Sequence, residues 1–521
     1  MPRWLQRASH WPLYGLMAAA YPVVFLYGQN VEQAVAPYEW LVPLAVSLAA
    51  AAISMGIFRL ATGDWQRSAL ITTVLVALFF TYGLAWEWLG KMLLGQWVLI
   101  IAWVLLAVTA AASVWRMPEK ARQFTVGLNA VGTLLLLVNV VLIGAFFLNV
   151  RVIASSGMSG VTASGQGIRP AKRPDVYWII LEEYGSASVL QDYFDFDNTP
   201  FLSALRQRGF YIADDATANY LKTAHSVDSS RNMEYLNGPK LEAQAKSPSD
   251  WGPMYHGLKA PFEVQTFLNS LGYRFIYSGA YWPPMATHPA AEINYVYDNA
   301  TSEFIDVLEQ ATLLRALEGL GTAAPYDWRL NRWNWTNWQL EAINRASELA
   351  GPKFVHVQIA LDHEPYVFHA DGSFVSEVDE KSRPHEVDYI DQLKFTNTQM
   401  LAWVDKVLNV PADQRPIIIM QADEGPWPPG YRSNEIGFDW TKATVDDLKE
   451  KFGILSAFYV PSKTPQQAGL YASITPVNQF RALFGSYFDL ELPMLPDRNY
   501  IWPNQKDIYN LIDVTAKVQG P

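Results

Sequence analysis

The stretch PIIIMQADEGPWP, residues 416–428, joins an apolar run directly to two adjacent carboxylates. A proline opens it, three isoleucines follow, and the chain turns polar at Asp423 and Glu424. This pattern predicts a buried strand with two acids at its C-terminal end. In parallel α/β sheets, that edge is where ligands and metals bind. The alternative is an ordinary acidic turn, because Asp and Gly are common turn residues.

Two other apolar runs also end in acids. The run DVYWIILEEYG ends in Glu182 and Glu183, and KFVHVQIALDHEPYVF ends in Asp362, His363 and Glu364. The C-terminal ends of parallel strands meet at one edge of a sheet, so we expect these side chains to converge. Oxygen-rich ligands favour a hard divalent cation such as manganese, magnesium or calcium, with zinc as an alternative. The three runs together therefore predict a metal site.

A candidate nucleophile lies in NYLKTAHSVDSSRNMEYL, residues 219–236, where Thr223 stands at the entry to a helical pattern. A hydroxyl at a helix N-terminus lies at the positive end of the helix dipole, and a metal ion can ionise it. Alternatively, Thr223 or Ser226 only caps the helix.

Helical patterns lie between the predicted strands, at 198–208, 261–272 and 385–408. Strands that alternate with helices predict an α/β domain with a mainly parallel central sheet, over residues 173–521. The residues before it, 151–172, are small, polar and rich in glycine, which predicts a flexible linker.

The first 150 residues differ in composition from the rest. A membrane-spanning helix needs about 20 mostly apolar residues. The stretches that meet this need are roughly 11–29, 39–60, 68–86, 95–115 and 124–149. The sequence therefore predicts a five-helix transmembrane domain over residues 1–150.

The charges of the connecting loops predict its orientation. Basic residues lie in the N-terminus and in the second and fourth connections, for example Arg3, Arg67 and Arg116. The first and third connections are mainly acidic, with Glu32 and Glu87. Because basic loops stay in the cytoplasm, the N-terminus is expected there, and five crossings place the chain after residue 150 outside.

Composition excludes some functions. The 521 residues carry a net charge of −11, which argues against nucleic acid as a partner. The chain has no cysteine, which excludes disulfides, thiolate metal sites and a cysteine nucleophile.

Two aromatic segments leave alternatives open. Residues 279–299, which include His288, are expected to form either a loop that faces substrate or a packed surface loop. The tryptophans of 327–338 are expected either in the core or in contact with sugars or the membrane surface.

Several motifs occur in an order that points to a known family. They are DVYWIILEEYG, NTPFLSALRQRGFYIADDATANYLKT, SSRNMEYLN, QADEGP and ITPVNQFRALFGSYFDLELPMLPDR. As a set they resemble the membrane-bound sulfatase-like proteins of bacteria, within the alkaline phosphatase superfamily. The plan of five spans followed by an outer domain is similar to that of lipoteichoic acid synthases. The resemblance covers most of residues 172–500 and implies a multi-pass protein of the bacterial inner membrane.

The resemblance implies a metal-dependent hydrolase or transferase acting on a phosphate or sulfate ester. By position, Glu182 binds the metal, with Glu183 as the alternative. Thr223, which follows an Asn-Tyr pair, matches the nucleophile and is also a metal ligand. Asp423 matches the aspartate of a late Asp-His motif, and His363 matches a histidine that contacts the phosphoryl group.

One departure from the family pattern concerns Glu424, which stands where the family has histidine and is taken as a further metal ligand. With Glu182, Asp423 and an ionised Thr223, a single divalent ion would be over-neutralised and the site would repel an anionic substrate. A second metal would resolve this conflict, and so would a degenerate, non-catalytic site. A third resolution is a nearby cation, the candidates being Lys222, Arg231 and His363.

The Thr223 region lacks the Cys/Ser-x-Pro-x-Arg pattern of formylglycine sulfatases, which favours phosphoryl transfer over sulfate ester chemistry. The expected function is a phosphotransferase or phosphohydrolase that acts on a lipid-linked or cell-envelope glycan and contacts membrane lipids. The alternative is a degenerate family member that serves as an envelope binding or scaffold protein. Neither the ester nor the oligomeric state follows from the sequence.

Overall fold

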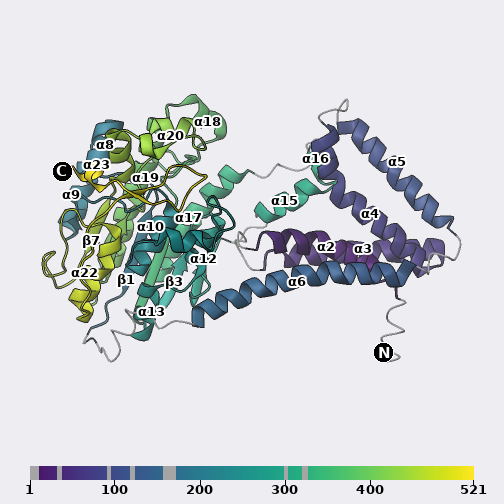
Figure 1. Cartoon of the computed structure of the whole chain (residues 1–521), viewed down its shortest axis with the longest axis horizontal. Helices are drawn as coiled ribbons and strands as arrows, with labels where there is room; N and C mark the ends of the chain where they lie inside the picture. Colours follow the sequence, from purple (N-terminus) through teal and green to yellow (C-terminus); the bar gives the residue numbers. More distant parts are fainter. Residues whose placement is uncertain are drawn as a thin grey trace. The chain divides into compact units, whose positions relative to one another are not determined.

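The computed structural model describes residues 11–31, 38–90, 96–117, 124–155, 170, 172–297, 303–318 and 327–520. The chain divides into two compact units, whose elements are labelled in Figure 1. The membrane unit comprises Met1–Asn149 and Asp298–Trp328, and the outer unit comprises Val150–Tyr297 and Arg329–Pro521. Most of the predicted linker lies outside the described residues, although residues 151–155 continue a helix.

The membrane unit contains the helices α2 (Tyr14–Gln29), α3 (Leu41–Thr62), α4 (Trp65–Ala85), η1 (Trp86–Gly90), α5 (Gln96–Trp115) and α6 (Thr125–Ser155). Among the described residues, four helical segments are long and apolar enough to cross a membrane: Leu41–Thr62, Trp65–Leu89, Trp97–Trp115 and Thr125–Phe146. The fifth expected span forms α2, whose 16 residues extend about 24 Å, less than the ~30 Å of a hydrocarbon core. Five spans are therefore not confirmed.

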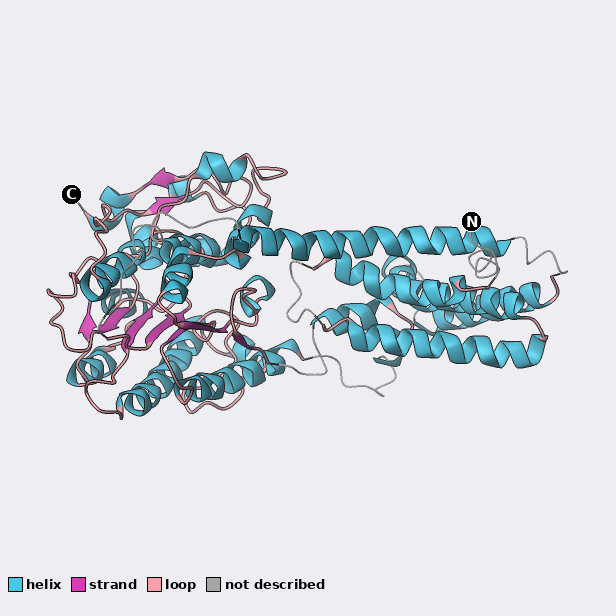
Figure 2. Cartoon of the chain, turned by 90° about the horizontal axis from the view of Figure 1, so that it is seen from below, coloured by secondary structure: helices cyan, strands magenta, loops and turns pink. Residues whose placement is uncertain are grey.

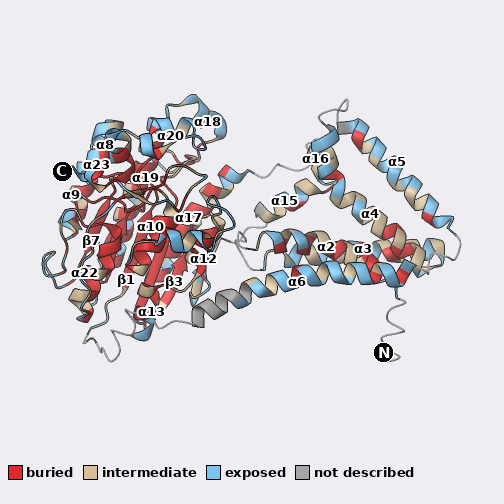
Figure 3. Cartoon of the chain, in the orientation of Figure 1, coloured by how far each residue is buried: buried red, intermediate tan, exposed pale blue. Residues whose placement is uncertain are grey.

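The surfaces of these helices are apolar. Figure 3 shows exposed residues along much of α5 and α6. Leu60 of α3 is 90 % exposed and Leu134 of α6 is 61 % exposed. Contiguous apolar surface of this kind marks an interaction with a membrane or a partner, and here it lies on helices long enough to span a bilayer.

A short segment from much later in the sequence belongs to the membrane unit. It contains α15 (Glu303–Ala311) and α16 (Arg315–Glu318), and we call it the insertion. The backbone N–H of Leu313 donates to the carbonyl of Phe79 at 2.9 Å. A Cβ on Gly83 would lie 2.1 Å from the Gln310 carbonyl oxygen, so only glycine allows this close approach of the two backbones. The sequence had predicted residues 303–318 as part of the outer domain.

The outer unit is built on a seven-stranded sheet with the order β2-β7-β6-β1-β5-β3-β4. Its strands are β1 (Val176–Leu181), β2 (Tyr211–Ile212), β3 (Arg274–Ser278), β4 (Ile293–Tyr295), β5 (Lys353–Ile359), β6 (Ile417–Gln421) and β7 (Ser456–Tyr459). Strands β1, β3, β4, β5 and β6 pair in parallel, and β7 is antiparallel to β6 and β2. Helices cover both faces of the sheet (Figure 2). The predicted α/β architecture with a mainly parallel sheet is confirmed.

The remaining elements of the outer unit lie around this sheet. They are α8 (Ala187–Phe194), α9 (Thr199–Gln207), α10 (Thr223–Asn232), α11 (Gly238–Glu242), α12 (Gly252–Lys259), α13 (Glu263–Ser270), α14 (Pro283–Ala286), α17 (Trp328–Ser347), α18 (Glu377–Ser382), α19 (His385–Leu408), α20 (Pro429–Ser433), η3 (Trp440–Lys442), α21 (Val445–Phe452), α22 (Pro476–Phe488), α23 (Thr515–Gln519), β8 (Tyr500–Ile501) and β9 (Ile512–Asp513). Helices α9, α13 and α19 confirm the three helical patterns read from the sequence.

The core explains why the strands read as continuous apolar runs. Every residue of β1, β5 and β6 is buried, as expected for strands covered on both faces.

The two aromatic segments, residues 279–299 and 327–338, differ in how far their side chains are buried. His288 is buried and its Nε2 lies 3.1 Å from the Ala260 carbonyl, as in a packed loop. Trp335 is buried, whereas Trp328 is half exposed.

Candidate active site

The three acidic strand ends meet at one edge of the sheet. Strand β1 is central, with Leu181 beside Ile359 of β5 and Ile180 beside Gln421 of β6. The residues that follow these strands therefore lie at the same level, as predicted. The acids placed there are all buried: Glu182, Glu183, Asp362, Asp423 and Glu424.

Glu182 and Asp423 form one half of this cluster. Burial raises the pKa of Glu182 to about 8, and the neighbouring Asp423 adds to the shift. The amide of Gln358 donates to Glu182 Oε1 at 2.7 Å and opposes it. Burial also raises the pKa of Asp423, to about 6, and the Thr223 side chain opposes this shift. Two buried carboxylates that repel one another favour any cation placed between them.

Thr223 is the first residue of α10, and its side chain is partly exposed. The Thr223 side chain lowers the pKa of Asp423, so its hydroxyl lies near that carboxylate. The Ser226 hydroxyl instead donates to the Tyr220 carbonyl at 3.3 Å. Thr223 therefore faces the acids. The preceding turn is fixed by Asn219, whose Oδ1 accepts from the Val477 N–H at 2.9 Å. The dipole of this ten-residue helix favours negative charge on the hydroxyl.

Glu424 lies in the other half of the cluster, beside a lysine that the sequence analysis missed. Lys451 is completely buried, and its Nζ lies 3.5 Å from Glu424 Oε1. The ammonium also donates to the Gly425 carbonyl at 2.6 Å and lies 3.2 Å from the centre of the Trp427 ring. Burial lowers the pKa of Lys451, and the acids, Glu424 first, oppose this. The signal in the sequence was its place three residues after Leu448 on one face of α21.

Glu183 shares this half of the site with His363. Its carboxylate accepts a hydrogen bond from Trp427 Nε1 and lies 3.3 Å from His363 Nε2. Burial raises the pKa of Glu183 to about 7, and Lys451 opposes the shift. The backbone of Glu183 has a φ of 59°, a left-handed conformation that is strained for a residue with a Cβ and recurs at functional sites.

His363 is accessible at the surface of the cluster, with its side chain 35 % exposed. Partial burial lowers its pKa, and the guanidinium of Arg332 lowers it further. The ring is therefore neutral at pH 7 and does not supply the positive charge considered in the sequence analysis.

The other proposed cations have different partners. Arg231 pairs with Asp228 at 2.9 Å and donates to the carbonyl of Leu258, also at 2.9 Å. Lys222 pairs with Glu435 at 2.8 Å, although its charge still lowers the pKa of Glu183 and Glu424. Arg231 is thus committed to a structural ion pair.

Arg332 is a second cation that the sequence analysis missed. It is buried on α17, donates to the backbone carbonyls of Ala360 and His363, and lowers the pKa of Glu182. Its Nη1 is buried without a hydrogen-bond partner in the structure. Lys451 and Arg332 are therefore the buried cations of the acidic cluster.

Asp362, which follows β5, is the remaining buried acid at this edge of the sheet. Its Oδ1 accepts from Thr396 Oγ1 at 2.8 Å, and its Oδ2 is buried without a hydrogen-bond partner. Burial raises the pKa of Asp362 to about 8. The folded protein therefore holds a proton on Asp362 between pH 4 and pH 8 that the unfolded chain releases above about pH 3.9.

This proton gives a testable dependence of stability on pH. Because the folded state binds more protons over that range, raising the pH through it lowers the free energy of unfolding. We expect the Asp362→Asn variant to lose less stability than the native chain between pH 5 and pH 9, by at least about 1.4 kcal/mol, the equivalent of one pKa unit. Thermal unfolding of the full chain in detergent measures this. The exposed Asp371→Asn variant is the control, and equal pH slopes for native and Asp362→Asn proteins would contradict the assignment.

The donor atoms fit a hard cation in part. Asp423 Oδ2 and Glu424 Oε2 are buried without hydrogen-bond partners, and the set of carboxylates and a hydroxyl suits magnesium, manganese or calcium. As the side chains stand, however, no three His, Asp or Glu residues in the described parts of the chain are grouped closely enough to hold a metal ion. Glu182, Asp423 and the Thr223 hydroxyl lie together, while Glu424 pairs with Lys451.

No family model matches the sequence, and no curated protein matches it. Several solved structures match the fold of this chain. The zinc complex of the C-terminal periplasmic domain of EptC from Escherichia coli has 11 % identity and a TM-score of 0.42, covering 68 % of this chain and 98 % of its own. The integral membrane lipooligosaccharide phosphoethanolamine transferase EptA from Neisseria meningitidis has 12 % identity and a TM-score of 0.39, covering 91 % and 95 %.

A Vibrio parahaemolyticus protein of the alkaline phosphatase superfamily has 14 % identity and a TM-score of 0.38, covering 67 % of this chain and 83 % of its own. The superfamily that the motifs resemble is thus named among the structural neighbours. With TM-scores below 0.5, these likenesses leave the activity to be argued from the residues of this chain.

Proposed function

We propose that this chain is a phosphoryl transferase or hydrolase that uses Thr223 as its nucleophile. The observation that carries the proposal is the position of Thr223, which is the first residue of α10, and its side chain lowers the pKa of the buried Asp423 beside Glu182. A partly exposed hydroxyl beside a buried acid, with a helix dipole behind it, has the arrangement of an activated nucleophile.

The reaction begins with attack of Thr223 Oγ on the phosphorus of an ester. Asp423, the buried carboxylate whose pKa the Thr223 side chain lowers, accepts its proton. The Oγ–P bond forms, the P–O bond to the leaving group breaks, and the leaving oxygen takes a proton from solvent. Water or an acceptor hydroxyl then attacks the phosphothreonine and releases its proton to solvent. The Oγ–P bond breaks, and Asp423 returns its proton to Thr223 Oγ. Hydrolysis and transfer differ only in this acceptor.

The cations and His363 handle the negative charge of the substrate. Lys451 offsets Glu183 and Glu424, and Arg332 offsets Glu182, which reduces the repulsion of an anionic ester. His363, the exposed member of the cluster, contacts the transferred group. Phosphoethanolamine transfer, named for two structural neighbours, belongs to this reaction class.

A divalent metal is the remaining part of the proposal. Glu182, Thr223 and Asp423 would hold it, with Glu424 as the fourth ligand if it releases Lys451. The ion would supply positive charge that favours the ionised hydroxyl and stabilises the transferred phosphoryl group. Manganese is our first choice, with zinc, magnesium or calcium as alternatives.

Metal content tests these ligands. We expect one tightly held divalent ion per full-length chain, measured by elemental mass spectrometry after purification in detergent and reloading. Asp423→Asn should lose it, because the variant removes a buried carboxylate between Glu182 and Thr223. Glu424→Gln tests whether the fourth ligand is needed, and Glu377→Gln, an exposed carboxylate on α18, is the control. Equal metal content in the native and Asp423→Asn proteins would contradict the ligand set.

The membrane unit supports an extracytoplasmic position for the reaction. Tyr27 at the end of α2 contacts Phe304 of the insertion at 6.1 Å between ring centroids, and the end of α4 contacts the same insertion. At the opposite end of α2, Tyr14 Oη donates to the Gln66 carbonyl at the start of α4. Helix α2 therefore extends along the same layer as α4, and we propose it as the fifth span.

With α2 as a span, the loop charges place the ends of α2 and α4 outside, on the side of the residues that follow 150. This agrees with the insertion, which comes from that part of the sequence. The proposed location is the bacterial inner membrane, with a lipid-linked or cell-envelope glycan as substrate.

The second candidate is a non-catalytic binding or scaffold protein of the envelope. The observation that favours it is the pairing of Glu424, which replaces the family histidine, with the buried Lys451. A scaffold need not bind a metal or turn over a phosphate ester, so the metal measurement and the activity of Thr223 variants separate the two candidates.

A further inference from the structure

A cavity in the membrane unit lies outside the acidic cluster. It has a volume of about 490 Å³ and is lined by Trp86, Glu87, Trp88 and Arg315. Three of these residues lie in η1, a π-helical turn, and the fourth begins α16 of the insertion. Pi-helical turns are rare and recur at functional sites. The volume lies within the range of small-molecule sites, about 300–1,000 Å³.

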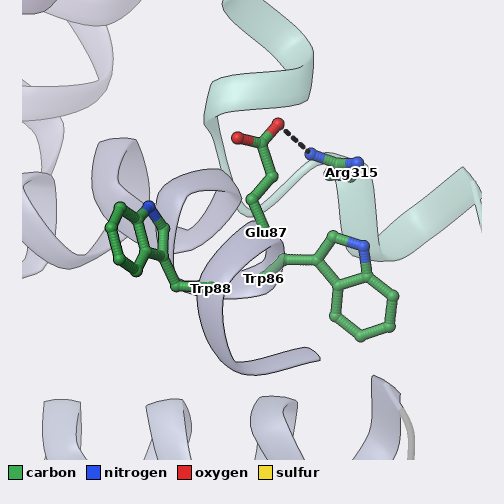
Figure 4. Close-up of a pocket in the computed structure, with 4 residues that line it drawn as sticks. All are labelled: Trp86, Glu87, Trp88 and Arg315. Atoms are coloured by element: carbon green, nitrogen blue, oxygen red, sulfur yellow. Dashed lines mark hydrogen bonds and ion pairs between the residues drawn. The ribbon is translucent and has the colours of Figure 1, made fainter. Parts of the chain in front are cut away.

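The cavity lies at the end of a membrane-spanning segment. Trp65–Leu89 is long and apolar enough to cross a bilayer, and η1 forms its last residues. Trp88 is 74 % exposed there. Tryptophan is enriched at the level of lipid headgroups, where its ring contacts chains and its N–H meets polar groups. Figure 4 shows Trp86 and Trp88 on opposite sides of Glu87, whose carboxylate points to Arg315.

The insertion holds this cavity in place. Ala316 is buried against Tyr82 and Leu99, with Trp86, Ile100 and Leu313 packed around them. The N–H of Leu313 donates to the carbonyl of Phe79. Arg315 therefore stands at a fixed position beside η1, because its neighbours Leu313 and Ala316 are both anchored.

The two charged side chains of the cavity, Arg315 and Glu87, form a loose ion pair. Arg315 Nη1 lies 3.4 Å from Glu87 Oε1, longer than the ~2.7–2.9 Å of a tight charge-assisted hydrogen bond. The Arg315 side chain is 25 % exposed and that of Glu87 is 63 % exposed. The positive group is thus the more covered of the two, and the negative group is the more open to solvent.

We propose that this cavity binds the headgroup of a phospholipid that is zwitterionic and carries an ammonium group. The phosphate, which lies nearer the acyl chains, pairs with Arg315, and the ammonium, which lies farther out, pairs with Glu87. Trp86 and Trp88 contact the glycerol and upper chain region. An anionic lipid would meet the same arginine but would also meet the carboxylate of Glu87. The lipid is a resident of this site, and its binding is independent of the reaction at Thr223.

Native mass spectrometry of the full chain, delipidated and titrated with phosphatidylethanolamine, phosphatidylglycerol or diacylglycerol, tests the proposal. We expect saturable binding of one phosphatidylethanolamine, at least about tenfold tighter than phosphatidylglycerol, and no saturable binding of diacylglycerol. Arg315→Gln should weaken phosphatidylethanolamine binding about tenfold or more, whereas Arg315→Lys should retain most of it.

The Glu87→Gln variant gives the sharpest outcome. Its arginine is no longer balanced by a carboxylate, so we expect the preference to shift toward phosphatidylglycerol. Arg59→Gln is the control, since Arg59, in the last turn of α3, also faces a tryptophan, Trp65, at the opposite end of α4 from η1. Equal binding of the two phospholipids by the native chain, or unchanged preference in Glu87→Gln, would overturn the proposal. Loss of binding in both Arg315→Lys and Arg59→Gln would do so as well, because it would show a general effect on the fold.

Discussion

The Thr223→Ala variant of the full chain is expected to lose its phosphoryl transfer or hydrolase activity by at least about a thousandfold, while remaining folded. The loss follows because the variant has no atom to form the bond to phosphorus, and removal of a covalent nucleophile leaves only the residual effect of the surrounding charges. Turnover of a nitrophenyl phosphate diester or monoester in detergent measures it, with thermal unfolding as the check on folding.

Two further variants sharpen this experiment. Thr223→Ser keeps a hydroxyl at the same position and is expected to retain measurable activity. Ser226→Ala, three residues later on the same helix, is the matched control, because the Ser226 hydroxyl bonds to a backbone carbonyl and not to Asp423. Activity in a folded Thr223→Ala protein close to that of the native chain would refute the nucleophile.

The second large effect is expected at Lys451. The Lys451→Met variant leaves Glu183 and Glu424 buried without their counter-charge, and breaking a buried ion pair in this way costs about 3–5 kcal/mol of stability. We expect a loss of this size in chemical unfolding followed by tryptophan fluorescence, since Trp427 lies against the lysine. Lys449→Met, on the same helix but exposed, should change stability little.

A second substitution distinguishes charge from packing. If Lys451 acts by balancing Glu424, the double variant Lys451→Met/Glu424→Gln should recover part of the lost stability, because it removes the buried charge that the first change left unpaired. A double variant as unstable as the sum of its two single variants would show that Lys451 acts through its contacts with Trp427 and Gly425.

The sheet and its acidic edge could be predicted from the sequence because both depend on local patterns. Continuous apolar runs that end in acids specify buried parallel strands, and the ends of such strands must meet. Asp423 and Glu182 therefore converge wherever the loops between them run. The roles of Asp423 and Glu182 as metal ligands stay predictions. The same two carboxylates could also have their negative charge neutralised by the buried cations Lys451 and Arg332, without a metal ion.

The parts that could not be predicted depend on contacts between distant segments. Lys451 follows Glu424 by a loop, two short helices and most of α21. Its spacing from Leu448 indicates a buried face of that helix, but it does not indicate which acid the lysine meets. A short amphipathic helix such as α15 has the same pattern whether its apolar face meets the outer domain or a membrane helix. The sequence therefore assigned the insertion to the domain in which it is encoded.

The contact of the insertion with α4 sets an order of events during synthesis. The helix that ends at Leu89 is complete long before Glu303 is made, and at about 5–20 residues per second the interval is roughly 10–40 s. Throughout that time the Phe79 carbonyl and the Gly83 surface are uncovered by the segment that will occupy them. Another membrane helix or an assembly factor has this interval in which to bind α4, so the final pairing is decided by a competition in time as well as by affinity.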